Sequence, residues 1–352
     1  MSDIRILLGK LLKPIGRYKK IKTRITEFLT IQMGYRPSKK QVEWCLGDYF
    51  LFRRKYKGSL ETDYLGAQMF RKSEFVREES FSNKSRFKWR LSIQEQKYKH
   101  IFEDKKYFYE SFAKYLHRKW MIVDKDTKKD DFVDFVKECG HEIIVKDTLS
   151  YGGKGVNFYK LKGNSEITKL YDLCIQGCFV VEEKIIQCEE INSFSGKAVN
   201  TFRIVTVIDD SGNVHIARAI FRIGRGNCIL DNYSSGGIAA QIDIKSGIIY
   251  TTAQDKSGRE YINHPDTGKQ IVGYKISDWE EYKKFALELA EQYPTFRYVG
   301  WDILKNKDGV YCVIEGNDSA GFGAMESPLL YGLKPYFNAL VKGKEAPYKI
   351  NS

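Results

Sequence analysis

The sequence predicts an α+β protein, with sheets that carry helices on one face and a helical region that precedes them. Three features of the chain lead to this class. Strand and helix patterns alternate after residue 100 without the regular spacing of βαβ units. Two glycine-containing turns, at 152–155 and 305–309, each join two strand patterns directly, as β-hairpins do. The first 100 residues show helical periodicity instead.

Length and composition exclude several classes of protein. With 352 residues, 42% hydrophobic and 14% aromatic, the chain can form two or three subdomains with their own cores. No segment approaches the ~20 apolar residues of a membrane span, and Asp3 and Arg5 near the start do not fit a secretory signal. The seven cysteines lack CxxC spacing, which favours reduced thiols and argues against zinc. We therefore expect a cytoplasmic protein.

The positive charge of the chain is concentrated in its first part. The net charge is +13, yet residues 1–100 contain 24 Lys and Arg against 10 Asp and Glu, whereas residues 101–352 contain 34 against 35. Such a basic region can face nucleic acid, anionic lipid or an anionic substrate. The alternative is a solvated helical face without a partner.

Helices are expected over 4–33, 39–57 and 73–99. In the first stretch, apolar residues recur at helical spacing between Lys and Arg, and the pattern breaks at Pro14 to Gly16. A basic amphipathic helix of this kind can lie on the inner face of an anionic membrane. Its apolar stripe can equally pack on the rest of the protein.

The later elements follow from apolar runs, acidic helix starts and glycine stops. Asp104 begins a helix and Gly140 ends another, while short apolar runs mark the strands. The expected helices cover 104–117, 127–139, 165–174 and 277–292, and the expected strands cover 119–123, 141–146, 156–160, 178–183, 200–208, 214–223 and 237–244.

The loop between the strands 141–146 and 156–160 is a candidate phosphate site. Its glycines, Gly152, Gly153 and Gly155, would let backbone N–H groups approach phosphate oxygens, and Lys154 would add charge. Lys146, at the end of the preceding strand, would reach the same phosphates. The loop joins two strands and lacks the Ser or Thr of a Walker A loop. The alternative is an ordinary tight turn.

The stretch 179–187, FVVEEKIIQ, runs from an apolar strand into two carboxylates and then an apolar pair. Its backbone can offer donors and acceptors to an adenine edge, with Glu189 or Glu190 near the ribose hydroxyls. The alternative is a strand that ends in a solvated acidic turn.

The hairpin 298–314 is a candidate magnesium site. Glu315 and Asn317 lie two residues apart and so point to the same strand face, and the hairpin can bring Asp302 beside them. Two carboxylates and an amide oxygen are hard ligands that suit Mg²⁺. The alternative is a hairpin with a polar end.

His264 is a candidate for proton transfer or substrate contact, because the sequence HPDTG fits neither a strand nor a helix. The alternative for a single His in such a turn is a structural role.

Together these motifs resemble the ATP-grasp superfamily. The resemblance covers about residues 104–340 and rests on the order Asp104-Lys105, IIVK with GGKG, VVEEKI, Asp302 and Glu315-x-Asn317. The segments VNTFRIVTV at 199–207 and NHPDTGKQIVGYKISDW at 263–279 resemble the sugar-transfer-associated branch, which is linked to bacterial surface polysaccharides. The stretch 222–237 is similar to the Arg…Ser-Asn…Gly-Gly stretch of ribosomal-protein glutamate ligases.

The resemblance implies a role for each motif residue. Lys105 (or its neighbour Lys106) and Lys146 would contact ATP phosphates under a lid formed by Gly152 to Gly155. The adenosine contacts would be Glu183, Lys184, Ile186 and, at the ribose, Glu190. Asp302, Glu315 and Asn317 would hold Mg²⁺. Arg203 and Arg222 would face the transferring phosphate, and Asn232 with Gly236 and Gly237 would line the acceptor side.

The same resemblance implies the domain boundaries. A basic helical region over 1–100 would precede an ATP-grasp domain over 101–345. That domain would divide into an α/β segment at 104–140, a lid subdomain at 141–186 and a catalytic subdomain at 187–345.

The chemistry implied is ATP-dependent ligation of a carboxylate to an amine or other nucleophile through an acyl-phosphate. The partners would be ATP, Mg²⁺, an anionic carboxylate and an amine acceptor, either of which can be sugar-linked. A kinase-like phosphotransferase is one alternative. A non-enzymatic basic adaptor for anionic lipid or nucleic acid is the other, although no RRM, KH or zinc signature supports nucleic-acid binding.

Overall fold

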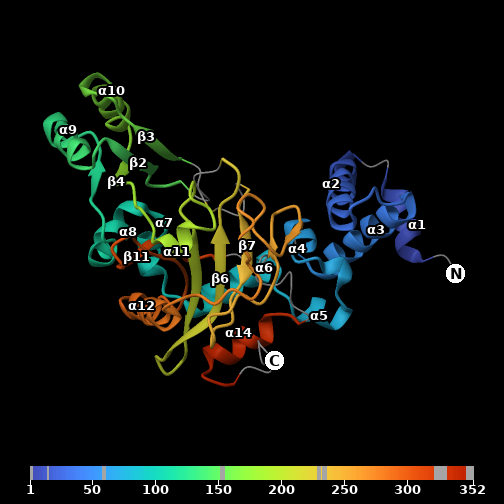
Figure 1. The fold of residues 1–352 in the computed structure, drawn as a ribbon. Coiled ribbons are helices and arrows are strands. Elements are labelled where there is room, and N and C mark those ends of the chain that lie inside the picture. Colours follow the sequence, from blue (N-terminus) through green and yellow to red (C-terminus); the bar gives the residue numbers. More distant parts are fainter. Residues whose placement is uncertain are drawn as a thin grey trace.

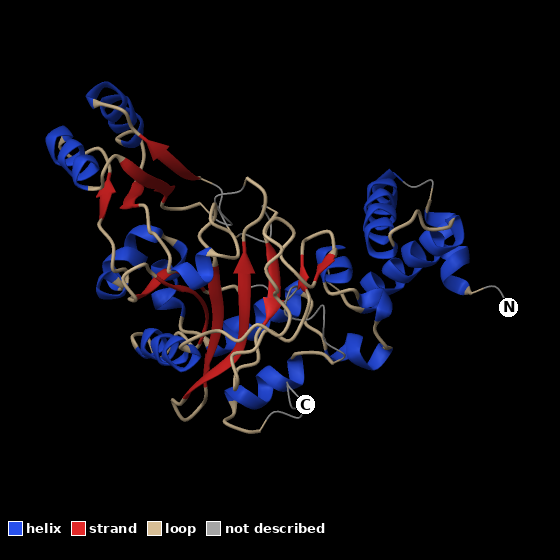
Figure 2. Cartoon of the chain, in the orientation of Figure 1, coloured by secondary structure: helices blue, strands red, loops and turns tan. Residues whose placement is uncertain are grey.

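The computed structural model describes residues 3–13, 16–57, 61–150, 155–227, 231, 236–320 and 331–345. The chain forms three parts: a group of N-terminal helices, a small four-stranded sheet and a large seven-stranded sheet (Figure 1). In the view of Figure 2 the large sheet occupies the centre, with the small sheet and the N-terminal helices at opposite ends. The α+β class expected from the sequence is confirmed.

The N-terminal helices build a core of their own. This unit contains α1 (Ile4–Leu12), α2 (Gly16–Met33), α3 (Lys39–Lys55) and α4 (Glu61–Gly66). Helices α1 and α3 approach closely at two glycines. A Cβ on Gly9 would lie 1.8 Å from the carbonyl oxygen of Glu43, and a Cβ on Gly47 would lie 1.8 Å from that of Arg5. Only glycine permits this backbone contact.

A buried carboxylate joins the same unit to the next helix, α5 (Glu74–Glu79). Asp48 accepts a bidentate pair from Arg77 at 3.0 and 2.7 Å and a hydrogen bond from Tyr64 at 2.7 Å. Arg5 Nε donates to it at 2.9 Å. A buried charge with this number of donors is satisfied, whereas loss of one partner would leave an uncompensated charge in the core.

Helix α6 (Asn83–Ile93) belongs to the large sheet and not to the N-terminal unit. Its Trp89 packs against Tyr298 of the sheet and Phe337 of α14 (Lys334–Val341). Helix α6 thus packs on the large sheet although it precedes residue 100, where we predict the end of the N-terminal region. The helical pattern expected over 73–99 is also divided, into α5, α6 and a short 3₁₀ turn at Gln96–Tyr98.

The small sheet is antiparallel, with the strand order β1-β4-β2-β3. Its elements are β1 (Trp120–Val123), α9 (Lys129–Glu138), β2 (Glu142–Asp147), β3 (Val156–Lys160), α10 (Asn164–Cys174) and β4 (Phe179–Glu183). One face packs on α9 and α10, and the other faces α8 (Lys105–Ser111). Because β1 pairs with β4, this unit begins near residue 120, before the boundary that we placed at 141.

The large sheet is antiparallel throughout, with the order β11-β10-β5-β6-β7-β8-β9. Its strands are β5 (Thr201–Ile208), β6 (Val214–Ile223), β7 (Ile238–Gln241), β8 (Ala253–Gln254), β9 (Glu260–Tyr261), β10 (Tyr298–Lys305) and β11 (Tyr311–Asn317). One face carries the main core beneath α12 (Trp279–Glu291), α7 (Lys99–Glu103) and α8. The other face carries a smaller core beneath α6 and α14.

Strand register brings distant charged residues into one row. Asp302 of β10 lies opposite Arg203 of β5 on one side and opposite Glu315 of β11 on the other. Arg222 of β6 lies opposite Thr201. Alternation sends all of these side chains to the face that carries α6 and α14.

No helix in the described part of the chain is long and apolar enough to cross a membrane.

We predict that Gly9→Ala destabilises the N-terminal unit by about 1–3 kcal/mol, because its Cβ would overlap the Glu43 carbonyl. Hydrogen exchange of the α1 amides measures the effect. Gly16→Ala is the matched control, since a Cβ there meets nothing within 4 Å. An equal effect of both substitutions would contradict the close packing of α1 on α3.

Candidate functional site

The centre of the candidate site is Asp302, a buried carboxylate between two arginines. Arg203 donates to it through Nε and through Nη2, the latter at 2.7 Å, and Arg222 Nη1 donates at 2.5 Å. Burial favours the neutral acid, but the charges of Arg203 and Arg222 outweigh it and hold the pKa of Asp302 well below its ordinary value. Asp302 is therefore ionised at neutral pH.

Glu315 and Asn317 extend this cluster towards solvent. The Asn317 amide donates to Glu315 at 2.8 Å, Arg203 Nη2 lies 3.7 Å from the same carboxylate, and the Glu315 side chain is 42% exposed. The hairpin thus brings together the three oxygen side chains predicted to hold a metal. No cluster of three or more His, Cys, Asp or Glu with metal-binding geometry occurs among the described residues, so Asn317 would be needed as a ligand.

Arg222 links this cluster to Asp231. Its Nη2 donates to Asp231 at 2.9 Å, and the hydroxyl of Thr201 donates to the other oxygen of the same carboxylate. Burial raises the pKa of Asp231 to about 6, since the charge of Arg222 only partly offsets it. The resemblance places Asp231 and Asn232 together in the Ser-Asn position and implies the acceptor role for Asn232, which lies outside the described residues.

A second charged group lies on the inner face of the small sheet. Lys146 Nζ lies 2.5 Å from Glu182 and donates to the Tyr109 hydroxyl at 2.8 Å. Arg118 Nε donates to the other Glu182 oxygen at 2.6 Å. Burial would raise the pKa of Glu182, but the charges of Arg118 and Lys146 outweigh it and lower the pKa to about 2.

Three members of this group were missed by sequence reasoning. Glu182 could have been found, because strand alternation places it on the same face as Lys146 across the β2–β4 pair. Tyr109 and Arg118 carry no comparable signal. Arg118 also donates to the carbonyl of Val313 at 2.9 Å, which connects the small sheet to the strand that carries Glu315.

Lys105 lies between the two charged groups. Its Nζ donates to the carbonyl of Asp147 at 3.0 Å and to the carbonyl of Ser150, at the start of the glycine-rich loop. Burial lowers the pKa of Lys105; the charge of Glu315 opposes this shift and that of Lys146 adds to it. The structure therefore places Lys105 at the base of the loop, close enough to Glu315 and Lys146 for their charges to act on it; its role as the first ATP lysine stays a prediction.

The glycine-rich loop is closed at its base. The Asp147 amide donates to the carbonyl of Gly155 at 3.1 Å, and Gly155 has a φ of +72°. A Cβ there would lie 2.9 Å from Ser150 Oγ, so glycine is required. Gly152, Gly153 and Lys154, predicted to contact phosphates, lie outside the described residues.

The connection after β4 runs from the small sheet to the large one. Lys184 pairs with Glu142 at 3.0 Å, and Glu183 accepts the Lys119 amide at 3.2 Å. Ile186 is 55% exposed, and its carbonyl accepts the Lys307 amide at 2.8 Å. Such an exposed apolar side chain between two sheets is available to a planar ring.

Glu190 and His264 make structural contacts. Glu190 accepts hydrogen bonds from the Tyr274 hydroxyl at 3.1 Å and the Ser277 amide at 2.9 Å. His264 is buried; its Nε2 lies 2.8 Å from the carbonyl of Gly224, and its Nδ1 accepts the Asp266 amide at 3.3 Å. Nδ1 is thus engaged by the turn and Nε2 by the residue that follows β6, and neither nitrogen contacts Asp302.

Gly236 and Gly237, predicted to line the acceptor side, border a further network. Arg225 donates to the carbonyl of Gly236 at 2.7 Å and pairs with Asp255 at 3.0 Å. The contacts of this network extend to α2, because a Cβ on the nearby Gly258 would lie 2.6 Å from Phe28.

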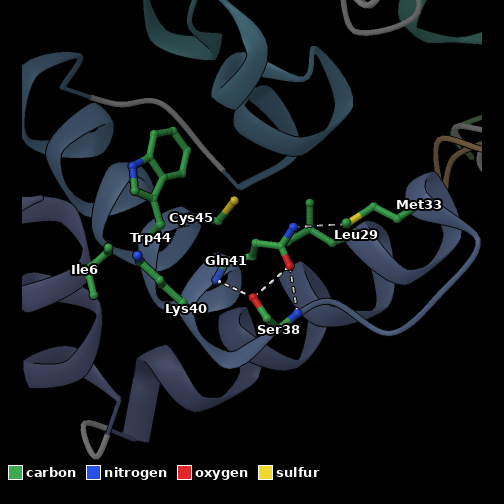
Figure 3. Close-up of a pocket in the computed structure, with 8 residues that line it drawn as sticks. All are labelled: Ile6, Leu29, Met33, Ser38, Lys40, Gln41, Trp44 and Cys45. Atoms are coloured by element: carbon green, nitrogen blue, oxygen red, sulfur yellow. Dashed lines mark hydrogen bonds between the residues drawn. The ribbon is translucent and has the colours of Figure 1, made fainter.

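An apolar pocket of about 270 Å³ lies in the N-terminal unit, away from these charges. Figure 3 shows Ile6 of α1, Leu29 and Met33 of α2 and Trp44 of α3 around it. Ser38 and Gln41 close one end through the capping box of α3. The predicted site residues contribute nothing to its lining.

Comparisons with solved structures find chains with limited similarity to this one. An ADP complex of N5-carboxyaminoimidazole ribonucleotide synthetase matches at 11% identity and a TM-score of 0.42, over 66% of this chain and 49% of that one. The Staphylococcus aureus N5-carboxyaminoimidazole synthetase matches at 10% identity and a TM-score of 0.45, over 70% of this chain and 53% of that one. The ATP-grasp ligase PsnB, complexed with minimal precursor, matches at 14% identity and a TM-score of 0.44, over 73% of this chain and 67% of that one. The chain thus spans about half the length of the synthetases.

No curated protein matches the sequence. The family described as sugar-transfer associated ATP-grasp matches over residues 84–340, a range that begins with α6 and ends in α14. This range contains both charged groups and the connection between the two sheets. The chain therefore belongs to the sugar-transfer-associated ATP-grasp family.

Proposed function

We propose that the protein is an ATP-dependent ligase that joins a carboxylate to an amine or other nucleophile through an acyl-phosphate, with release of ADP. The observation that carries this proposal is the convergence of four cations, Lys105, Lys146, Arg203 and Arg222, with the acidic hairpin between the two sheets. Four fixed positive charges suit a polyphosphate and the charge that develops during phosphoryl transfer.

The residues divide into an adenosine side and a phosphate side. Glu183, Lys184 and Ile186 would border the adenine at the connection between the sheets, and Glu190 would reach the ribose after giving up a present partner. Lys105, Lys146 and the loop 152–155 would hold the phosphates. Arg203 and Arg222, with Asn232 and the Gly236–Gly237 pair, would face the acceptor.

The donor set of the hairpin fits Mg²⁺. Glu315 presents an exposed carboxylate, Asn317 presents an amide oxygen, and Asp302 is ionised and adjacent. Mg²⁺ is commonly held by one or two carboxylates together with phosphate oxygens. When bound, the ion would neutralise charge on the phosphates.

The chain's own residues would then position the reactants. A carboxylate oxygen of the first substrate attacks the γ-phosphorus, the bond to the bridging oxygen breaks, and ADP leaves. The nucleophile next attacks the acyl carbon, the bond to phosphate breaks, and the nucleophile's proton is released. Arg203 and Arg222 lie where they can stabilise the transferring group, and holding both substrates in line lowers the entropic part of the barrier.

The biological setting that we propose is bacterial surface-polysaccharide synthesis, with amidation or aminoacylation of a sugar acid. The family description supports a link to sugar transfer. A kinase-like transfer to a sugar is the alternative chemistry, and it requires the same phosphate site without the second step.

We predict that Mg²⁺·ATP is converted to ADP and phosphate only when a carboxylate and an amine are both present. Glu315→Gln should slow this reaction by about 100-fold, because it removes charge from the hairpin. Glu288→Gln, an exposed change on α12, is the control and should have no effect. Chromatography of the nucleotides measures both. AMP with pyrophosphate would contradict the ligase, and a stable phosphorylated product without an amine would favour the kinase.

We predict that Glu182→Gln weakens ATP binding and stability together, because it removes the anchor of Lys146 and leaves two buried cations with less negative charge. The loss of stability should be about 3–5 kcal/mol. Glu142→Gln, which removes surface ion pairs on the same sheet, should cost less than about 1 kcal/mol. Urea unfolding and nucleotide titration measure the two effects.

The stability difference between wild type and Glu182→Gln should depend on pH, because the pKa of Glu182 is lowered in the folded protein. The contribution of ionised Glu182 to the free energy of unfolding is fully present above its ordinary pKa of 4.5 and is lost as the pH falls towards about 2. A difference between wild type and Glu182→Gln that persists at pH 2 would contradict the assignment.

We also propose that α1 contacts an anionic membrane surface. Its side chains Ile4, Leu7 and Leu11 are 63%, 52% and 62% exposed, share one helix face and adjoin the exposed Lys10. An apolar stripe beside cations is suited to the headgroup boundary.

Leu7→Ser and Leu11→Ser should each lower partitioning to phosphatidylglycerol vesicles by about tenfold, as expected for loss of one buried leucine. Vesicle co-sedimentation measures this. Leu173→Ser, at a leucine on α10 that is 53% exposed, is the matched control. Equal partitioning of all variants would contradict a membrane role for α1.

A further inference from the structure

A cationic cavity lies between α6 and the last residues of the β10–β11 hairpin. Its volume is about 380 Å³, within the range of small-molecule sites. It is lined by side chains of the first turns of α6 and by two residues of the hairpin region, namely Asn83, Lys84, Arg86, Phe87, Arg90, Tyr298 and Ser319. We call this cavity the α6 pocket. None of its residues has a role in the site described above.

The chemistry of the α6 pocket suits an oxyanion. Lys84, Arg86 and Arg90 contribute three positive charges. Lys84 and Arg86 lie near the N-terminus of α6, where the helix dipole is also positive, whereas Arg90 lies in its last turn. Arg90 is buried and lies 3.0 Å from Asp318 through Nη1, yet this nitrogen makes no hydrogen bond. A buried guanidinium nitrogen in this position has a donor to offer a ligand. Among the described residues, Asp318 pairs with Arg90 and Asp63 accepts the Asn83 amide at 3.2 Å, so these two carboxylates offset part of the charge.

The α6 pocket adjoins the Asp302 cluster through one strand. Tyr298, Gly300 and Asp302 alternate on the same face of β10, so the pocket lies about 13 Å from Asp302. Between them, a Cβ on Gly300 would meet Arg203 Cδ at 2.9 Å and Ala320 Cβ at 2.6 Å. Arg203, which binds Asp302, therefore packs against Gly300, and Gly300 lies on β10 between the α6 pocket and Asp302.

We propose that the α6 pocket binds an oxyanion, carboxylate or phosphate, of a sugar-sized substrate whose reacting end lies at Arg203. This inference rests on the proposed function and specifies its substrate class. It assigns a substrate-binding role to α6, the first helix of the range that matches the family. Arginine forms paired hydrogen bonds with either oxyanion, which Lys84 supports as a point charge.

Binding to the full-length protein tests the proposal without turnover. The probes are glucose 1-phosphate, glucuronate and neutral glucose, titrated calorimetrically, with Mg²⁺·AMPPNP titrated separately. At least one anionic probe should bind at millimolar concentration or below, and glucose should not. Lys84→Ala and Arg86→Ala should each weaken that probe by about tenfold or more, as expected for loss of a charged hydrogen bond.

The matched control is Lys88→Ala, which removes the same charge from α6 at an exposed position outside the pocket lining. It should leave the affinity of the anionic probe unchanged. Arg86→Lys, which keeps the charge, separates a binding effect from unfolding because it should retain part of the affinity. The anionic probe whose affinity falls in Lys84→Ala and Arg86→Ala identifies whether the α6 pocket binds a phosphate or a carboxylate.

The proposal is overturned if neither anion binds to the wild type, if Lys84→Ala and Arg86→Ala leave affinity unchanged, or if Lys88→Ala weakens it equally. Failure of the wild type to bind Mg²⁺·AMPPNP, with the anionic probes behaving as expected, would instead contradict the ATP-dependent function and leave the pocket in place.

Discussion

The paired contact of Asp302 with Arg203 and Arg222 organises this molecule. A carboxylate that is 2% exposed is stable in its ionised form only because two guanidinium groups, from the two strands nearest to it on one side, replace its water. The contact constrains the sheet in turn. A slip of one residue between β5 and β10 would send Arg203 to the opposite face, among the apolar side chains beneath α12, and leave Asp302 without its partner. The register between β5 and β10 in the large sheet and the ionised state of Asp302 therefore depend on each other.

The small sheet repeats this arrangement, again with one buried carboxylate between two cations. Glu182 is the buried carboxylate, and Lys146 and Arg118 are its cations. Arg118 extends the group to Val313 on β11, two residues before Glu315, and Lys105 lies close enough to both groups for their charges to act on its pKa. The two sheets thus meet across ionised side chains as well as across the apolar core, which Val180 of β4 and Trp120 of β1 share with the large sheet. Polar contacts of this kind can exchange partners when the sheets move relative to each other.

Much of the local structure was predictable from sequence. The hairpins, the strand limits around β5, β6 and β10, and the helix α12 are encoded by apolar runs between glycine-rich or polar turns, which act over a few residues. The proximity of the oxygen side chains on the hairpin was predictable for the same reason, since alternation alone places Glu315 and Asn317 together. The pairing of Arg203 with Asp302 spans 99 positions and depends on the order of the strands, which periodicity does not reveal.

The packing of α6 on the large sheet, although α6 precedes the boundary predicted at residue 100, was not predictable for a related reason. Helix α6 has the same helical periodicity whether its Trp89 packs on the N-terminal helices or on Tyr298 of the large sheet, so the pattern predicts the helix but not its neighbour. His264 and Glu190 illustrate the converse. Each has a residue type and a place in the sequence that favour a role in chemistry, yet backbone and tyrosine groups already occupy their polar atoms.

The charge balance of the site explains how a phosphate can enter it. Each of the four cations already has an acceptor within the protein: Asp302 for Arg203, Asp302 and Asp231 for Arg222, Glu182 for Lys146, and two carbonyls for Lys105. In the function that we propose, a polyphosphate would bind either through N–H groups that these contacts leave unused, since guanidinium has five and ammonium three, or by exchange with a present acceptor. The acceptors hold each cation in place before binding, so less side-chain entropy is lost when the phosphate arrives. They also prevent four like charges from repelling one another across the gap between the sheets. The acceptors therefore order the cations before a ligand is present. The affinity for a phosphate would be set by the hydrogen bonds that it forms with the cations, less those that the cations give up to their present acceptors.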